Sequence, residues 1–373
     1  MHRHIANGSR ILWCVAVIAA AVMFRAAGQP YEAVSAGQPV RIVRSQPAAP
    51  TPDGRAKEEV IVRFFGGAPG ETAGADVATI LYFGDVMMSR NVNAIMEKSG
   101  EENPFEVVKT VLPLADIAVA NLEGPVTERN NQPANRMVFH FSPSRAALLG
   151  RLGFDALDLA NNHAYDQGTK GAEDTRRSLA EKDLVAFGEA KSETGANAAV
   201  VKARGLRVAL VGFQDVTRSV DVAAAAKAVA KAKQSADLVI VSFHGGVEYR
   251  HEATDRQRML ARAAIDAGSD AVISHHPHVV EGIEVYKNRP IFFSLGNFIF
   301  DQYFSEDTQQ GLGVLLSVEG GVRRFSLLPI KSVRSQGRTM TDDERKKFLE
   351  DLAGWSASEL RADILRGVLT FPL

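Results

Sequence analysis

ADLVIVSFHG (236–245), HEATDRQRMLARAAIDAG (251–268) and SDAVISHH (269–276) follow one another along the chain. The first and third pieces are short apolar runs of the kind that forms a buried strand. The middle piece has a helical pattern and ends at Gly268, which is a typical helix stop. A strand, a helix and a strand in succession are typical of a layered α/β domain. This stretch therefore predicts an α/β fold.

The same alternation continues on both sides of this stretch. Other strand-like runs are VATILYF, ADIAVANLE, FDALDLANNH, LRVALVGF and RPIFFSLGNF, and a second helical pattern is GAEDTRRSLAEKD. The late pieces GLGVLLSVEGG and VRRFSLLPI predict a hairpin joined around Gly320 and Gly321. We therefore expect one large domain at 77–332, followed by a C-terminal helical extension at 333–373. A helix is predicted at 341–352, where an N-cap threonine precedes an acidic first turn.

The composition excludes several kinds of site. The chain has 373 residues with 43 Lys plus Arg against 44 Asp plus Glu, so no overall positive charge exists to hold a nucleic acid or an anionic membrane. Its only cysteine is Cys14, inside an N-terminal apolar run. The body of the protein therefore has no cysteine nucleophile, no intramolecular disulfide and no cysteine-rich zinc site.

The N-terminal segment has the pattern of a bacterial-type signal peptide. The apolar run ILWCVAVIAAAVMF (11–24) follows a positively charged start and precedes small residues. Arg25 interrupts the cleavage region, so an uncleaved signal anchor is the alternative. Residues 1–28 therefore predict a cell-envelope protein, periplasmic or extracytoplasmic, that is secreted or anchored in the membrane by its N-terminus. The next segment, 29–76, is rich in Pro, Gly, Ala and Gln and predicts a flexible linker.

Polar side chains able to bind a metal ion follow five of the strand-like runs. Ligands of an open α/β sheet collect at the carboxyl ends of its strands, because the loops there converge. His276 and His278 flank Pro277, which favours extended backbone before it and so predicts that both rings point the same way. His275 is then expected on the other face. The polar residues at the strand ends are Asp85, Asn121, Glu123, Asn161, Asn162, His163, Asp166, His244, Glu248, His276 and His278.

These side chains offer imidazole, carboxylate and amide groups but no sulfur. Imidazole suits transition metals better than it suits Mg²⁺ or Ca²⁺, so we expect one or two divalent ions of Mn, Fe or Zn. A site with such ligands can activate water and bind a phosphoryl or acyl oxygen. It differs from the closed sites that only stabilise a fold.

Six motifs, in this order along the chain, resemble those of the CapA family, named for formation of the poly-γ-glutamate capsule. They are GDVMMSR, ANLEGPVT, LANNHAYDQGTKG, FHGGVEY, SHHPHVVEGIEVY and FFSLGNFIFDQ, and they span about residues 79–305. The CapA family is similar to the calcineurin-like metallophosphoesterases. The resemblance implies a four-layer αββα sandwich of the metallophosphoesterase type, with a dinuclear metal site at the strand ends. It also implies partners, namely an anionic cell-surface polymer or its precursor and membrane proteins of capsule synthesis.

The resemblance also implies roles for individual residues. His163 corresponds to the histidine that helps to protonate a leaving group, and we group Asp166 with it as catalytic. The residues that correspond to metal ligands are Asp85, Glu123, Asn162, His244, His276 and His278. One position departs from the superfamily's first motif, Asp-x-His, because Met87 follows Asp85 by two residues and a thioether is a poor ligand for a hard divalent ion. The first metal position is therefore weakened, rebuilt or empty.

Two functions fit these residues. The first is an exported, metal-dependent hydrolase that activates water for attack on a phosphoester or on a peptide-like bond such as the γ-glutamyl bond. The second is a non-catalytic factor that binds the polymer during assembly or export through a degenerate metallophosphoesterase cleft. In either case we assign Asn121, Glu248 and Arg90 to substrate binding, since an arginine can pair with carboxylates through two hydrogen bonds. A nucleic-acid phosphodiesterase is disfavoured by the neutral charge and the export signal.

Overall fold

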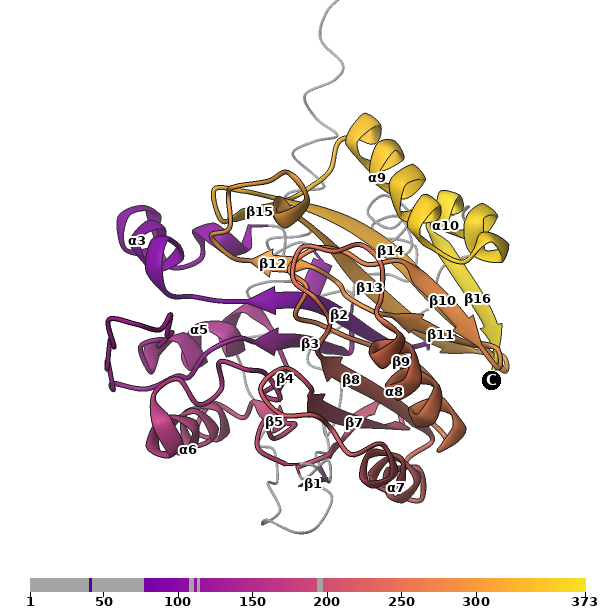
Figure 1. Cartoon of the computed structure of the whole chain (residues 1–373), viewed down its shortest axis with the longest axis horizontal. Coiled ribbons are helices and arrows are strands. Elements are labelled where there is room, and N and C mark those ends of the chain that lie inside the picture. Colours follow the sequence, from indigo (N-terminus) through magenta and orange to yellow (C-terminus); the bar gives the residue numbers. More distant parts are fainter. Residues whose placement is uncertain (1–39, 42–76, 107–110, 113–114, 193–196) are drawn as a thin grey trace, which may run out of the picture.

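The computed structural model describes residues 40–41, 77–106, 111–112, 115–192 and 197–373. Figure 1 shows two β-sheets lying face to face, with helices on their outer sides. The predicted signal segment lies outside the described residues, and so does the predicted linker apart from β1 (Val40–Arg41). Within the described residues, no helix combines the length and the apolar character that a membrane span needs.

The first sheet has seven strands. They lie in the order β1, β6 (Ala199–Ala203), β7 (Leu206–Gln214), β8 (Leu238–His244), β9 (Ala271–Ile273), β11 (Arg289–Phe292) and β10 (Ile283–Tyr286). Its centre is parallel, since β7, β8, β9 and β11 run the same way, while β6 and β10 each pair antiparallel with a neighbour. The predicted succession of strand, helix and strand is confirmed by β8, the helix after it and β9.

The second sheet has nine strands. Seven lie in the order β15 (Gln336–Thr339), β14 (Val322–Val333), β13 (Gln310–Glu319), β2 (Ala78–Val86), β3 (Ile117–Leu122), β4 (Ala156–Asp158) and β5 (Val185–Phe187). Two more pair outside this path, β12 (Asn297–Ile299) with β2 and β16 (Val368–Pro372) with β14. Strands β2 to β5 are parallel, so their carboxyl ends lie at one edge of the sheet.

Helices on the outer face of each sheet complete four layers (Figure 1). The second sheet is covered by α3 (Arg90–Ser99), α5 (Ser144–Leu152) and α6 (Gly168–Ala180), and the first by α7 (Val222–Lys233) and α8 (Asp255–Asp266). Side chains on β2 alternate, since Leu81 and Phe83 pack towards α3 and α5 whereas Ile80 and Tyr82 pack between the sheets. A third apolar core joins α7 and α8 to the first sheet. The predicted four-layer αββα sandwich is confirmed.

The C-terminal part of the chain contains the predicted hairpin and the predicted helix. β13 and β14 pair through Gly320 and Gly321, whose φ angles of +57° and +79° suit a two-residue hairpin turn. α9 (Asp342–Trp355) begins after Thr341, whose hydroxyl accepts an amide hydrogen bond in a capping box. α9 and α10 (Arg361–Arg366) pack against the core between the sheets. The sequence predicts a helical extension here, whereas β15 and β16 also join this segment to the second sheet.

α8 is shorter than the helix predicted at 251–268. It begins at Asp255, because Thr254 and Gln257 form a capping box in which each side chain accepts the other's backbone amide. Gly268, with φ +110°, lies just beyond its end, as predicted. Short 3₁₀ helices in the described part of the chain include η1 (Asn103–Phe105), η3 (Asp307–Gln309) and η4 (Ser358–Leu360).

A buried carboxylate joins the two sheets just below the strand ends. Asp158, the last residue of β4, accepts hydrogen bonds from the Ala160 amide at 2.8 Å and from the Ser242 hydroxyl on β8. Burial raises the pKa of Asp158 to about 6 in spite of these bonds. Gly212 on β7 leaves room for the group, since a Cβ there would lie 2.4 Å from a carboxylate oxygen of Asp158. These contacts fix β4 against β7 and β8.

Candidate metal centre

The carboxyl ends of strands from both sheets meet at one place. Asp85, near the end of β2, and Asn121, near the end of β3, are register partners. β12 places Asn297 beside Asp85 on the other side. His244, at the end of β8, pairs with His275 in an isolated bridge beyond β9. The strand ends that were predicted to converge therefore do so.

Two carboxylates, Asp85 and Glu123, lie fully buried at the centre of this region. The Asn121 amide joins them, since its Nδ2 atom donates to Asp85 Oδ1 at 2.8 Å and to Glu123 Oε2 at 3.2 Å. Each carboxylate keeps one oxygen, Asp85 Oδ2 and Glu123 Oε1, that has no hydrogen-bond partner. Burial, together with the nearby Asp85 charge, raises the pKa of Glu123 well above its usual value. Two charged carboxylates at this site therefore need a nearby positive charge, which a protonated His278 or a bound cation can supply.

His278 lies against both carboxylates. Its Nε2 atom is 3.6 Å from Glu123 Oε1, and its Nδ1 atom is 3.4 Å from Asp85 Oδ2 and 3.0 Å from Asn297 Oδ1. Burial lowers the pKa of His278, but Glu123 and Asp85 outweigh burial and raise it to about 9. Burial likewise acts to raise the pKa of Asp85, but His278 and His275 hold it below its usual value. Asp85, Glu123 and His278 form a group whose ligand atoms lie within 4.8 Å of one another.

A second group of ligands lies beside this one. His244 Nε2 is 2.7 Å from Asn162 Oδ1, and the centroid of the His244 ring is 4.9 Å from that of the His276 ring. His276 is buried, and its Nδ1 atom has no hydrogen-bond partner. Burial first, and neighbouring imidazoles second, lower the pKa of His244 well below its usual value and that of His276 to about 4. Both rings are therefore neutral near neutral pH, which is the form that binds metals.

The donor atoms fit a divalent transition metal. His244 Nε2 lies 2.7 Å from Asn162 Oδ1, and His278 Nε2 lies 3.6 Å from Glu123 Oε1. These distances are close to the roughly 3–3.5 Å between ligands that bind one ion at about 2.0–2.2 Å. A cation could contact the two unpartnered carboxylate oxygens and offset the repulsion between their charges. Imidazole nitrogens combined with carboxylate and amide oxygens suit Mn, Fe or Zn. The structure brings the predicted ligands into one site, namely Asp85, Glu123, Asn162, His244, His276 and His278.

Sequence comparison identifies the family. Residues 79–302 match the family described as bacterial capsule synthesis protein PGA_cap. The chain belongs to this family. The predicted resemblance to CapA is therefore confirmed.

Two relatives of the chain are similar over most of their own length. The chain is 34% identical over 277 residues to the PGA biosynthesis protein CapA of Bacillus subtilis (strain 168), and the match covers 70% of this chain and 73% of that protein. It is 32% identical over 286 residues to the capsule biosynthesis protein CapA of Bacillus anthracis, covering 70% of this chain and 69% of that protein. Among solved structures, it is similar to a putative 5′-nucleotidase from Staphylococcus aureus, with 16% identity, a TM-score of 0.40, and coverage of 74% of this chain and 58% of the other.

His163 faces the Glu123 carboxylate through one ring nitrogen. Its Nε2 atom is 4.0 Å from Glu123 Oε1, whereas its Nδ1 atom is 2.7 Å from Asp166 Oδ2. The same Asp166 oxygen accepts from the Phe139 amide at 2.7 Å, and the Phe139 and His163 ring centroids are 4.2 Å apart. Asp166, predicted as catalytic, is therefore placed to orient the His163 ring.

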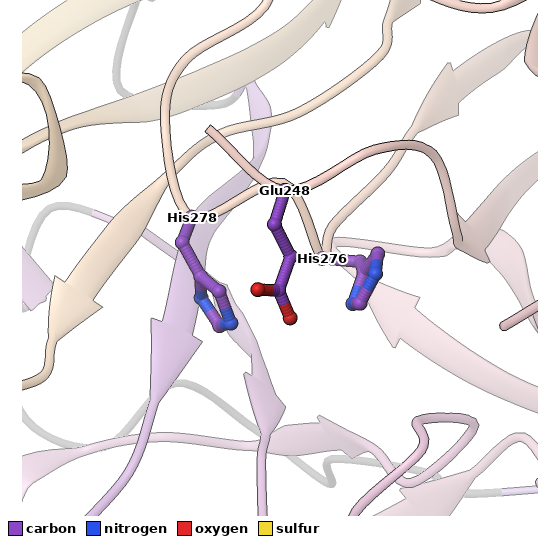
Figure 2. A group of neighbouring side chains, drawn as sticks. All are labelled: Glu248, His276 and His278. Atoms are coloured by element: carbon purple, nitrogen blue, oxygen red, sulfur yellow. The ribbon is translucent and has the colours of Figure 1, made fainter. Parts of the chain in front are cut away.

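The three residues predicted to bind substrate occupy different places. Asn121 is fully buried, and its amide bridges the two carboxylates, so it positions ligands and does not reach the open side. Arg90 lies at the rim, where its guanidinium pairs with Asp301 and lies 5.0 Å from the centre of the Phe139 ring. Glu248 is exposed and lies beside the imidazoles of the His-Pro-His loop (Figure 2).

The histidine loop differs from its prediction in two ways. His276 has φ +106° and His278 has φ +59°, so the backbone around Pro277 is not extended as expected. His275 was predicted on the other face, and this is wrong because its Nδ1 atom lies 3.5 Å from Asp85 Oδ1. The reason is a sharp bend after β9, which breaks the alternation of side chains that an extended strand has. Positive φ at a residue other than glycine costs energy and is frequent at functional sites.

Asn297 is a site residue that the sequence reasoning missed. Its Oδ1 atom faces His278, and it lies in the quoted motif FFSLGNFIFDQ at the start of β12. A signal was present, since Asn297 follows a strand-like run in the same way as the predicted ligands do. Met87 is fully buried, and its sulfur accepts from the Ser89 amide at 3.0 Å, so the thioether is satisfied by its own backbone.

Proposed function

We propose that this protein is an exported or membrane-tethered, metal-dependent hydrolase that acts in the biosynthesis of a capsule or poly-γ-glutamate-type polymer. The observation that carries the proposal is the pair of buried carboxylates, Asp85 and Glu123, whose unpartnered oxygens lie beside His278. Burial of two carboxylates is costly unless a cation offsets their charge. The names of the two Bacillus relatives, a PGA biosynthesis protein and a capsule biosynthesis protein, support the choice of polymer.

The site residues divide into ligands, positioning residues and a proton donor. The ligands supply a place for a divalent ion, which when bound polarises a phosphoryl or carbonyl oxygen and activates water. Asn121 holds the two carboxylates at a fixed separation through its Nδ2 atom. Asp166 accepts the Nδ1 proton of His163, which leaves Nε2 directed at the carboxylates. His163 can therefore hold a proton at Nε2 and deliver it to a leaving group.

The rim of the site suits an anionic substrate. The Arg90 guanidinium lies over the Phe139 ring and 5.8 Å from the centre of the Phe300 ring, and the Phe139 ring in turn packs against His163. An arginine beside the proton donor can bind a phosphoryl or carboxylate group of an anionic polymer or its precursor. We further propose that the protein works in the cell envelope with membrane proteins of capsule synthesis, to which segment 1–28 would deliver it.

Hydrolysis by the metal-loaded, full-length protein tests this function. Bis(p-nitrophenyl) phosphate and a γ-glutamyl peptide serve as substrates, and we expect turnover of one of them that chelator abolishes and added Mn²⁺ restores. Asp85→Asn should lose this turnover, whereas Asp343→Asn, at an exposed position in α9, should keep it. If the metal-loaded protein hydrolyses neither substrate while His276→Ala abolishes polymer output in cells, the protein is a non-catalytic binding factor.

A further inference from the structure

The loop between β8 and α8 carries a carboxylate at the mouth of the site. Glu248 is exposed, and its carboxylate lies within 4.8 Å of ring nitrogens of His276 and His278. Figure 2 shows the carboxylate between the two rings, with the three side chains pointing to the same side. We propose that Glu248 is a metal ligand, which completes a coordination position together with His276 and His278.

One side of the loop is fixed to the histidine loop. Tyr249, the residue after Glu248, has φ +64°, and its amide donates to the Pro277 carbonyl at 2.8 Å. The Tyr249 ring stacks on the His278 ring at a centroid distance of 6.3 Å, and its hydroxyl accepts from Gln302 at 3.1 Å. A strained backbone held by three contacts of this kind presents Glu248 in one position.

The other side of the loop is fixed to α8. Gln257 donates through Nε2 to the Gly245 carbonyl at 3.3 Å and to Glu281 Oε2 at 2.7 Å. Gly246 has φ +114° and lies so close to Gln257 that a Cβ would be 2.6 Å from its side-chain nitrogen. The loop that carries Glu248 is therefore held firmly against the site, although Glu248 itself is exposed to solvent.

His276, beside Glu248, has a ring nitrogen without a hydrogen-bond partner. His276 is only 4% exposed, yet its Nδ1 atom has no hydrogen-bond partner, and buried polar nitrogens normally have one. Met87, where the superfamily pattern has a histidine, offers no ligand because its sulfur accepts from the Ser89 amide. A carboxylate from Glu248 is a harder ligand than a thioether and suits Mn, Fe or Zn. The first metal position was expected to be weakened, rebuilt or empty. A carboxylate ligand from Glu248 favours a rebuilt position.

Metal binding tests the assignment, which rests on the proposed function because both require an ion at this site. We compare Mn²⁺ binding by full-length wild type, Glu248→Gln and Glu252→Gln, using titration calorimetry and the Mn²⁺ electron paramagnetic resonance spectrum. Glu252 is an exposed glutamate in the same loop and is the matched control. We expect Glu248→Gln to bind Mn²⁺ at least about tenfold more weakly with an altered spectrum, and Glu252→Gln to behave as wild type. Unfolding temperatures without metal should agree among the three proteins.

A second variant tests whether an imidazole at position 87 can replace the Glu248 carboxylate as a metal ligand. Met87→His in the Glu248→Gln background places a histidine two residues after Asp85 and should restore part of the affinity. Since Met87 is buried, this double variant can fail to fold, and Glu248→Asp, which keeps a carboxylate, should then bind more tightly than Glu248→Gln. Equal affinity of wild type and Glu248→Gln overturns the assignment and leaves the metal site intact. Absence of binding by wild type overturns both the assignment and the proposed function.

Discussion

His278 and Asn297 lie 3.0 Å apart, measured from the imidazole Nδ1 atom to the amide Oδ1 atom. The amide cannot be turned the other way, because its Nδ2 atom donates to the Thr308 carbonyl at 2.9 Å and to Gln302 Oε1 at 3.0 Å. Carbonyl oxygens only accept, so Asn297 must present its own oxygen to His278. Nδ1 therefore carries a proton, and Nε2, which lies 3.6 Å from Glu123 Oε1, is the nitrogen that a metal would bind in exchange for its proton.

Replacement of Asn297 by alanine should weaken metal binding. We expect the affinity for Mn²⁺ to fall about 10- to 100-fold, because the His278 ring loses the acceptor that sets its orientation and its tautomer. Titration calorimetry measures the affinity, and urea unfolding shows whether the variant is folded. Asn131→Ala, at an exposed loop position, is the control and should bind as wild type does. Unchanged affinity in folded Asn297→Ala would mean that other neighbours orient the ring.

The contact between His163 and Asp166 predicts a defect in proton transfer. His163→Ala should lower kcat for hydrolysis by about 10²- to 10⁴-fold, and by less when the leaving group is p-nitrophenol, which needs little protonation. Asp166→Asn should lower kcat less and leave KM and metal affinity unchanged, since it acts through the ring of His163. Asp183→Asn, at an exposed position, should have no effect. An equal loss for good and poor leaving groups, together with weaker metal binding, would instead make His163 a ligand.

Glu281 predicts a pH-dependent loss of stability. It is buried, one of its oxygens has no hydrogen-bond partner, and burial raises its pKa from 4.5 to about 8 in spite of the Gln257 hydrogen bond. A raised folded-state pKa means that the native state holds the proton more tightly, so the contribution is complete below 4.5 and is lost as the pH rises towards 8.

Glu281→Gln, which cannot ionise, should remove this loss. We expect the metal-free variant to be more stable than wild type by on the order of 2 kcal/mol at about pH 8.5, and to differ much less at about pH 5. Urea unfolding at the two pH values measures the difference, with Glu319→Gln at an exposed position as the control. Parallel pH profiles for wild type and Glu281→Gln would show that the Glu281 carboxylate does not titrate in this range.

Gly212 and Gly354 predict opposite effects of the same substitution. A Cβ at Gly212 would lie 2.4 Å from one carboxylate oxygen of Asp158 and 2.9 Å from the other, so Gly212→Ala should destabilise the fold by about 1–3 kcal/mol. Gly354, in α9, has nothing within 4 Å of the added atom, and Gly354→Ala should stabilise by about 0.4–1 kcal/mol. Chemical unfolding measures both. A Gly212→Ala protein as stable as wild type would mean that the sheets can separate around Asp158 at little cost.

Much of the fold could be predicted from the sequence, because apolar strands and helices leave local patterns. The run that becomes β8 and the glycine pair between β13 and β14 each carry their own signal. Helix starts were less predictable, since α8 begins at Asp255 only because Thr254 and Gln257 cap each other. The strands β15 and β16 were missed, because they are stabilised by pairing with β14 and not by a pattern of their own.

The site was predictable in its ligand types but not in its geometry. Histidines and carboxylates at the strand ends indicated which residues form the candidate metal site. The chain topology brings these residues together as expected. The positive φ angles of His276 and His278 could not be foreseen, because Pro277 alone favours extended backbone before it. The same is true of the contact between His275 and Asp85, which depends on the bend after β9.

The central claim is that the buried group around Asp85, Glu123 and His278 binds a divalent transition metal. Elemental analysis of the full-length protein, purified without chelator, tests it most directly when the unfolding temperature is measured before and after chelation. We predict one or two equivalents of Mn, Fe or Zn per chain, a fall in unfolding temperature on chelation that added metal reverses, and loss of the metal in the Asp85→Asn/Glu123→Gln double variant. A protein with no stoichiometric transition metal, and with an unfolding temperature that chelator leaves unchanged, would contradict the claim.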